Sequence, residues 1–120
     1  MNNVSLIGRL TKDPELRNIS DGVSVCNFTL AVDRRFKKEG QPTADFIDIV
    51  VWNKAAEFAT KWFSKGIRIG VIGRIQNRSW EDDGGVRHYR TEVVAESLYF
   101  ADGKKDGVDL ESEDDDDLPF

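Results

Sequence analysis

The sequence has little cysteine and histidine and no long apolar run, and each scarcity excludes a class of protein. Of 120 residues, one is a cysteine, Cys26, so no disulfide can form within the chain and no cysteine-based metal site can be built. The single histidine, His88, excludes a histidine-based metal or catalytic cluster. No apolar stretch approaches the roughly 20 residues of a membrane span, and residues 1–4 lack the pattern of a signal peptide. These absences predict a soluble cytoplasmic protein that holds no metal ion or other cofactor.

Negative charge is concentrated at one end of the chain. The net charge is −5, but residues 1–100 hold 15 Lys and Arg against 13 Asp and Glu, a net of +2. Residues 101–120 hold 2 against 9, a net of −7. The body of the protein is therefore slightly basic, and binding to a polyanion stays possible where the basic residues cluster.

The last residues join an acidic run to an apolar end. Five consecutive acids repel one another, which predicts one domain in residues 1–100 and a disordered acidic tail in 101–120. The final residues offer a stiff apolar anchor and a free carboxylate, which is typical of a peptide that binds an apolar pocket with a basic rim in a partner protein. The predicted partner-binding tip consists of Asp114, Asp115, Asp116, Asp117, Leu118, Pro119 and Phe120. A solvated tail without a partner is the alternative.

Alternating apolar residues predict five β-strands in the body. These strands cover residues 3–10, 23–33, 45–52, 67–78 and 88–99. Residues 11–21 contain Asp-Pro and Ser-Asp-Gly and are predicted to form a loop, as is the basic stretch 34–42. Residues 82–85, Asp-Asp-Gly-Gly, predict the tip of a β-hairpin.

One helix is predicted between the third and fourth strands. Apolar residues recur at helical spacing at Ala55, Phe58, Ala59, Trp62 and Phe63. Asn53 is the expected N-cap and Gly66 is expected to follow the C-terminus, with Trp62 and Phe63 packed in the core. An all-β chain of five strands with a helix at this point has the order of an OB-fold barrel. A five-stranded α+β sheet is the alternative.

The strand faces turned away from the core carry flat and basic side chains. In the third strand this face holds Phe46 and Trp52. In the fourth strand the expected core face is Ile67, Ile69, Val71, Gly73 and Ile75. The opposite face carries Arg68, Gly70, Ile72, Arg74, Gln76 and Arg78, with Trp80 just beyond. Unpaired bases stack on aromatic rings while Arg and Lys neutralise phosphates, so the pattern predicts single-stranded nucleic-acid binding. Ordinary packing of Phe46 and Trp52 is the alternative.

With these features in place, the chain resembles bacterial and phage single-stranded DNA-binding proteins of the tetrameric OB-fold type. The stretches that carry the resemblance are residues 4–10 (VSLIGRL), 13–17 (DPELR), 28–32 (FTLAV), 73–80 (GRIQNRSW), 89–94 (YRTEVV) and 114–120 (DDDDLPF). The resemblance implies a homotetramer that binds and protects single-stranded DNA without sequence preference during replication, recombination and repair. It also implies that the acidic tip recruits proteins of these pathways.

The resemblance extends to individual residues of the predicted site. It implies that bases stack on Phe36, Phe46, Trp52 and Trp80. It implies phosphate contacts near Arg17, Arg34, Arg35, Lys54, Lys65, Arg74 and Arg78, to which strand parity adds Arg68. His88 is interpreted as structural.

The sequence departs from the family in its linker. Residues 101–110 are short and charged where family members usually have a long Gly/Pro/Gln-rich stretch, which fits a phage, plasmid or secondary paralogue. Three other functions stay open. These are an RNA-binding or primosomal accessory module, a nuclease that binds Mg²⁺ through Asp45, Asp48 and the tail aspartates, and an adaptor that acts only through its tip. Asp45 and Asp48 are expected on opposite strand faces, which argues against the nuclease.

Overall fold

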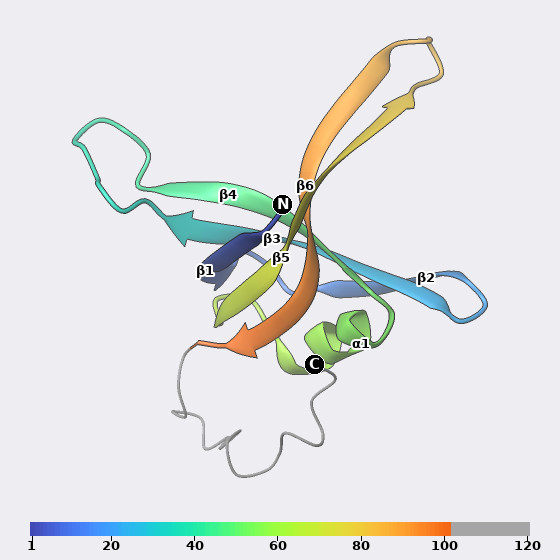
Figure 1. The fold of residues 1–120 in the computed structure, drawn as a ribbon, viewed down its shortest axis with the longest axis horizontal. Helices are drawn as coiled ribbons and strands as arrows, with labels where there is room; N and C mark the ends of the chain where they lie inside the picture. Colours follow the sequence, from blue (N-terminus) through green and yellow to red (C-terminus); the bar gives the residue numbers. More distant parts are fainter. Residues whose placement is uncertain (102–120) are drawn as a thin grey trace.

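Residues 1–101 form six β-strands and one helix. A computed structural model describes residues 1–101, so the predicted linker and tip in 102–120 lie outside the described residues. The elements are β1 (Val4–Leu10), β2 (Glu15–Ser20), β3 (Val23–Asp33), β4 (Ala44–Trp52), α1 (Asn53–Trp62), β5 (Arg68–Glu81) and β6 (Arg87–Phe100) (Figure 1).

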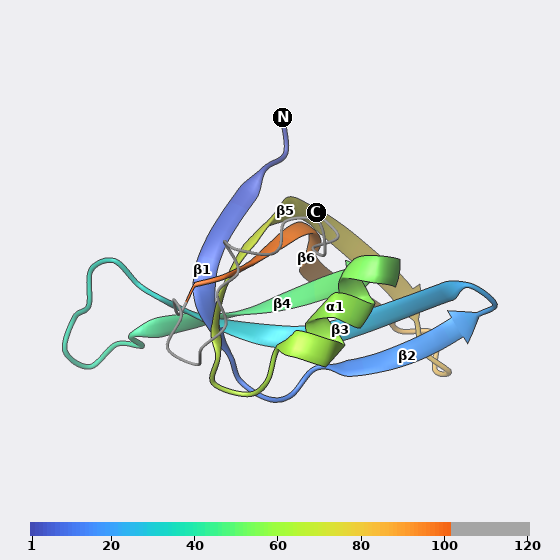
Figure 2. The same ribbon diagram turned by 90° about the horizontal axis from the view of Figure 1, so that it is seen from below.

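Five of the strands close into a barrel. The sheet order is β1-β5-β6-β4-β3-β2, and a further pairing of β1 with β3 closes the ring. All pairs are antiparallel except β4 with β6, where Ile49 lies opposite Val93. The helix lies between the third and fourth barrel strands, β4 and β5, and packs against β3 and β4 (Figure 2). The predicted OB-fold barrel is therefore confirmed, and the open α+β sheet is wrong because β1 and β3 pair.

Strand β2 replaces part of a predicted loop. Residues 15–20 pair with β3 outside the barrel closure, with Leu16 opposite Cys26. All six side chains of β2 are exposed, and the apolar Leu16 and Ile19 do not alternate. Backbone pairing with β3, not burial of alternate side chains, positions this edge strand, so the sequence shows no strand pattern there. The turn that follows was expected, and Gly22 adopts a positive φ of 77° there.

The core fills the barrel and its contact with the helix. Its largest fully buried side chains are Leu30 of β3, Ile49 of β4, Ile69 of β5 and Leu98 of β6, and Ala56 and Ala59 of α1 are fully buried with them. Phe58 and Phe63 pack edge-to-face against each other and against Phe100, with ring centroids 5.3 to 6.0 Å apart. The predicted core face of β5 ends early, because Ile75 is 48% exposed.

Two glycines permit the close crossing of strands that closes the barrel. A Cβ atom on Gly8 would lie 2.4 Å from the carbonyl oxygen of Ala31. A Cβ atom on Gly73 would lie 2.1 Å from the carbonyl oxygen of Val94, next to a register shift between Ile72 and Gly73. Any side chain at either position would push backbone apart, so the closed barrel requires glycine here.

The helix differs from its prediction at both ends. Trp52, not Asn53, is the N-cap, and no side chain caps the helix. Asn53 has φ +52°, and its Oδ1 atom accepts a hydrogen bond from the Ser24 backbone N–H at 3.2 Å, so its side chain serves β3 instead. Phe63 is buried as predicted, but Trp62 is 47% exposed with the Lys61 ammonium over its ring. The buried face follows Ala56, Phe58 and Ala59, which leaves Trp62 at its edge.

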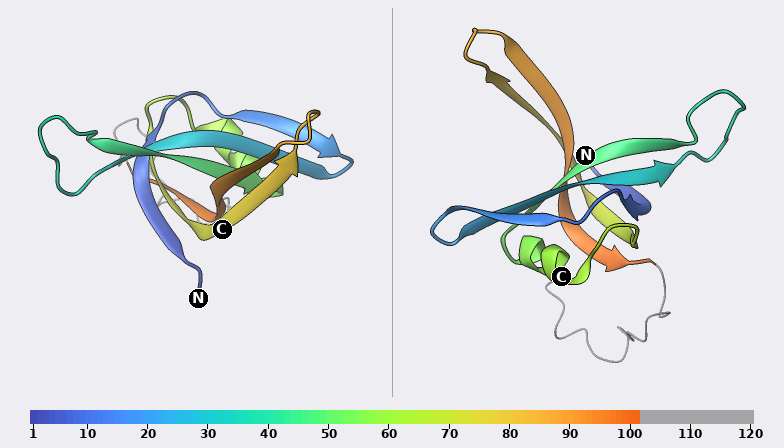
Figure 3. Two further views of the ribbon diagram at one scale, coloured as in Figure 1. Left: turned by 90° about the horizontal axis from the view of Figure 1, so that it is seen from above. Right: turned by 180° about the vertical axis from the view of Figure 1, so that it is seen from behind.

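Three projections extend from the barrel. They are the β2–β3 hairpin, the loop 34–43 between β3 and β4, and the β5–β6 arm, which Figure 3 shows from two sides. The predicted arm tip is confirmed: Asp82 accepts hydrogen bonds from the backbone of Gly84 and Val86, at 2.9 and 3.0 Å, and Gly85 has φ +82°. Side chains of residues 75–91 are all exposed.

Candidate nucleic-acid interface

Two adjoining hollows form a groove between the β2–β3 hairpin, β4 and the base of the β5–β6 arm. The first has a volume of about 320 Å³ and the second about 200 Å³. Both are lined by Arg17, Asn27, Arg78 and Glu92. We call this surface the groove. It joins side chains from five strands that are far apart in the sequence.

Three of the predicted site residues meet in the groove. Trp52, which is 41% exposed, lines the second hollow together with Arg17 and Arg78. The predicted outward face of β4 is confirmed at Phe46 and Trp52, whereas Val50 on the same face is buried. The groove therefore presents an indole ring beside two guanidinium groups.

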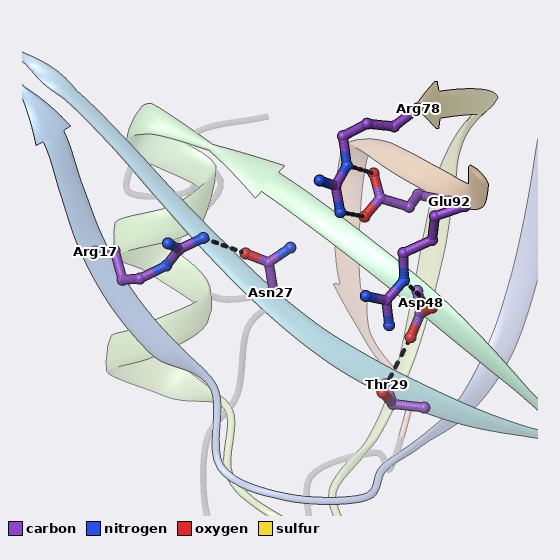
Figure 4. A network of polar contacts seen from close by, with 7 residues as sticks. Arg17, Asn27, Thr29, Asp48, Arg78 and Glu92 are labelled. Carbon is purple, nitrogen blue, oxygen red and sulfur yellow. Dashed lines mark hydrogen bonds and ion pairs between the residues drawn. The ribbon is translucent and has the colours of Figure 1, made fainter. Parts of the chain in front are cut away.

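The arginines of the groove are held by neighbouring side chains (Figure 4). Arg78 donates two hydrogen bonds to Glu92, from Nε at 3.3 Å and from Nη2 at 3.2 Å. Arg17 donates from Nη2 to the neutral amide oxygen of Asn27 at 3.2 Å. The contact with Asn27 does not offset the positive charge of Arg17, whereas the Glu92 carboxylate balances the charge of Arg78.

A second ion pair lies beside the first. Arg90 donates from Nε to Asp48 at 2.9 Å, and the Thr29 hydroxyl donates to the same carboxylate at 3.3 Å. The hydrogen bond that Arg90 donates to the Asp48 carboxylate raises the pKa of Arg90. Arg78 of β5 and Arg90 of β6 are cross-strand neighbours, so their positive charges repel each other. The carboxylates of Glu92 and Asp48 offset this repulsion.

The loop 34–43 carries a further aromatic site. Phe36 is 81% exposed, and Phe46 at the base of the loop is 67% exposed. Arg34 binds Asp45 with its Nε and Nη2 atoms, at distances of 2.8 to 3.2 Å. Hydrogen bonding to Arg34 holds the pKa of Asp45 below its usual value. Phe36 and Phe46 do not line either hollow of the groove.

Trp80 continues the site along the arm. Its ring stacks on His88, with centroids 5.4 Å apart, and the Arg78 guanidinium lies over it at 4.7 Å. His88 also contacts Asp82 through Nε2 at 2.8 Å, and this hydrogen bond lowers the pKa of Asp82. His88 therefore supports the arm, in agreement with its structural interpretation.

The other predicted cations lie outside the two hollows. Lys54 is exposed in the first turn of α1, and Arg35 is exposed in the loop 34–43. Arg74 pairs with Glu96 at 3.2 Å. The backbone N–H of Lys65 donates to Asp13, a lining residue of the first hollow, at 2.7 Å.

Arg68 lies on a different surface, so strand parity placed it wrongly beside Arg78. It lines a hollow of about 750 Å³ formed by β1, β5 and β6. Exposed side chains there are Ile7, Ile72 and Tyr99, at 53%, 40% and 46%. We call this surface the apolar face. Strand β5 is twisted, and its pairing with β6 shifts register after Ile72. For these reasons, side chains of the same parity along β5 face two different surfaces.

Sequence reasoning missed Asn27, Arg90 and Glu92 as groove residues. No local signal placed them, because a tip at residues 82–85 would put Tyr89 opposite Arg78, whereas the structure puts Arg90 there and Glu92 opposite Gln76. Asp48 was weighed only as a metal ligand. Among residues 1–101 no three His, Cys, Asp or Glu side chains gather as a metal site. No helix in the same part of the chain is long and apolar enough to cross a membrane.

Known proteins match this chain over nearly its whole length. The profile described as "Single-strand binding protein family" matches residues 1–101. Single-stranded DNA-binding protein 2 of Clostridium acetobutylicum is 53% identical over 133 aligned positions, which cover all of both chains. Single-stranded DNA-binding protein 3 of that species is 60% identical, and the Clostridium tetani single-stranded DNA-binding protein is 56% identical; each alignment covers 83% of this chain and 70% of the relative. The chain therefore belongs to the single-strand binding protein family.

Proposed function

We propose that this protein binds single-stranded DNA without sequence preference and protects it. The observation that carries the proposal is the half-exposed Trp52 beside Arg17 and Arg78 in the groove. Family membership supports the same substrate, since the relatives are single-stranded DNA-binding proteins by name. The proposed activity is binding, with no catalytic step.

The proposed binding path runs from the loop 34–43 through the groove to the arm. Bases stack on Phe36, Phe46, Trp52 and Trp80, which are exposed by 39 to 81%. Each stacked base contributes roughly 1–3 kcal/mol. The proposed phosphate contacts are Arg17, Arg34, Arg35, Lys54, Lys65 and Arg74. Arg68 contacts DNA only if the strand continues onto the apolar face.

The apolar face supports assembly into a homotetramer. Three large apolar side chains lie exposed around one hollow, and a second copy that covers them removes this surface from water. DNA would then wrap around several grooves of one assembly. The proposed contacts between copies are made by Ile7, Ile72 and Tyr99.

The tip is proposed to recruit partners. The acidic residues 113–117 steer it toward basic pockets, while Leu118, Pro119 and Phe120 provide the apolar anchor. The partners are proteins of replication, recombination and repair, and the proposed location is the nucleoid and replication forks in the cytoplasm. Deleting residues 114–120 is expected to abolish capture of such partners while DNA binding persists.

The first experiment is a titration with oligo-thymidine, followed by tryptophan fluorescence at low and high salt. Strong quenching that saturates at a fixed nucleotide ratio is expected, and affinity should fall as salt rises. Duplex DNA should compete poorly because its base faces are hidden. Absence of quenching and binding would overturn the proposal. Tighter binding to RNA than to DNA of equal length would identify RNA as the ligand instead. Cleavage of the strand with Mg²⁺ present would contradict the non-catalytic role.

A further inference from the structure

Glu92 is a buried charge at the floor of a surface groove. Only 4% of the residue is exposed, and it is the one buried ionisable acid or base of residues 1–101 apart from the Cys26 thiol. Removing a carboxylate from water is costly unless it is paired and hydrogen-bonded. Both of its oxygens accept hydrogen bonds from Arg78, so the pair meets this requirement.

Arg78 is fixed on two sides. Its Nε and Nη2 edge is bound to Glu92, and its guanidinium lies over the Trp80 ring at 4.7 Å. The side chain nevertheless remains 48% exposed and lines both hollows of the groove. A planar group is therefore held rigidly, with part of its surface open to a ligand.

A phosphate is a poor match for this guanidinium. Glu92 occupies the Nε and Nη2 edge of Arg78, so a phosphate can bind that edge only by displacing Glu92 and leaving a buried carboxylate unpaired, and otherwise reaches only the remaining N–H groups on Nη1 and Nη2. The charge of the pair is also already balanced, so little counterion release is available. By contrast, Arg17 is bonded to the neutral Asn27 and offers a net positive charge in the same groove.

From these contacts we propose that Arg78 is a stacking surface for a base, and that Glu92 is the residue that positions it. Flat guanidinium groups stack on bases, as aromatic rings do. Trp52 lines the same hollow as Arg78, so a base that enters it meets both an indole and a guanidinium. The proposal rests on the proposed function and assigns Arg78 a role different from that of Arg17.

The test compares Arg78→Lys and Arg78→Ala with the matched pair Arg17→Lys and Arg17→Ala. Lysine keeps the charge but has no planar surface. Arg78→Lys is expected to weaken oligo-thymidine binding about as much as Arg78→Ala, by roughly 5-fold or more. Arg78→Lys keeps the charge balance with Glu92 and should leave the salt slope of log K unchanged, whereas Arg17→Ala should make the slope shallower by about 0.7. Arg17→Lys should keep the slope.

Base dependence gives a second readout. An abasic oligomer of the same length offers phosphates but nothing to stack. Its affinity should be unaffected by Arg78→Lys and reduced by Arg17→Ala. Wild-type affinity of Arg78→Lys for oligo-thymidine would show that the charge alone is enough, which would make Arg78 a phosphate contact and overturn the proposal.

Glu92→Gln tests the positioning role without changing the side-chain shape. Once the balancing charge is gone, Arg78 becomes a net cation, and the salt slope should steepen by up to about 0.7. A role in folding alone would lower thermal stability and leave the slope unchanged, and that result would contradict the assignment. If wild-type protein fails to bind oligo-thymidine in the same titration, the proposed function fails. If it binds and Arg78→Lys matches it, only the role of Arg78 fails.

Discussion

The groove and the apolar face both include residues of β5 but differ in chemistry. Arg68, Gly70 and Ile72 of β5 line the apolar face, while Gln76 and Arg78 of the same strand line the groove. The apolar face has one hollow of about 750 Å³ with exposed aliphatic and aromatic groups. The groove has two smaller hollows whose floor alternates arginine and carboxylate.

The groove is not simply basic. Its two central arginines are each balanced by a carboxylate, so its floor is close to neutral. Net positive charge is left to Arg17 and to cations at the periphery. Shape and flat surfaces are therefore expected to bind bases at the centre, while charge acts mainly at the rim.

The largest effect is expected from Tyr99→Asp, which would break the apolar face. A carboxylate at a covered apolar contact pays a desolvation cost of several kcal/mol. The assembly should dissociate toward the 13.6 kDa chain, as measured by light scattering after gel filtration. Tyr89→Asp, on the 75% exposed Tyr89 of the arm, is the matched control and should stay assembled. If both variants have the same mass in solution, the apolar face is not the contact between copies.

Phe46→Ala should weaken DNA binding and leave assembly intact. Because Phe46 is 67% exposed, its loss does not open a core cavity. Loss of one stacked base predicts an affinity lower by roughly 5- to 150-fold, or about 1–3 kcal/mol. Fluorescence titration measures this value, and Phe46→Trp, with its larger ring, should bind at least as tightly as wild type. Unchanged affinity in Phe46→Ala would place the DNA path away from the loop 34–43.

A smaller effect, on the salt dependence of DNA binding, is expected to distinguish the groove from the apolar face. Arg68→Gln should leave the salt slope of DNA binding unchanged, because Arg68 lines the apolar face. A slope shallower by about 0.7, as expected for the loss of one phosphate contact, would show that DNA continues onto that face. The measurement is a series of titrations between low and moderate salt, with Arg35→Gln as a control from the proposed path.

The smallest effect concerns acid stability at the loop. The pKa of Asp45 is lowered by Arg34, so this pair stabilises the folded state above the ordinary Asp pKa of about 3.9. That contribution is lost as pH falls through the folded-state pKa, below about 4. Asp45→Asn should therefore lower Tm slightly at neutral pH and show a weaker fall in acid than wild type. Glu39→Gln, in the same loop, controls for the loss of one negative charge; an identical pH profile in Asp45→Asn and wild type would contradict the prediction.

The barrel could be predicted because its strands have one buried side. Alternation identified every barrel strand, and the helical repeat identified α1 with Phe58 and Phe63 in the core. Strand β2 could not be predicted in this way, because it is held at an edge by backbone pairing and buries no side chain.

The candidate site could be predicted only in part. Parity correctly placed Trp52 and Arg78 on outward faces, but it assumed a straight strand and so put Arg68 beside them. The ion pairs of Arg78 and Arg90 depend on cross-strand register and on β4 lying beside β6. Such contacts between distant residues do not appear in any local pattern.

The β5–β6 arm has a consequence for how the chain tolerates insertions and deletions. From Asn77 opposite Thr91 to Glu81 opposite Arg87, the arm pairs only with itself, outside the closed ring. Two residues added to or removed from each strand would change the reach of the arm and keep every side chain on its face. A change of one residue in each strand would reverse the faces beyond it. The arm can therefore lengthen in even steps beyond Trp80 while Arg78, Glu92 and the barrel stay as they are, whereas removing two residues beyond Arg78 would take away its contact with Trp80.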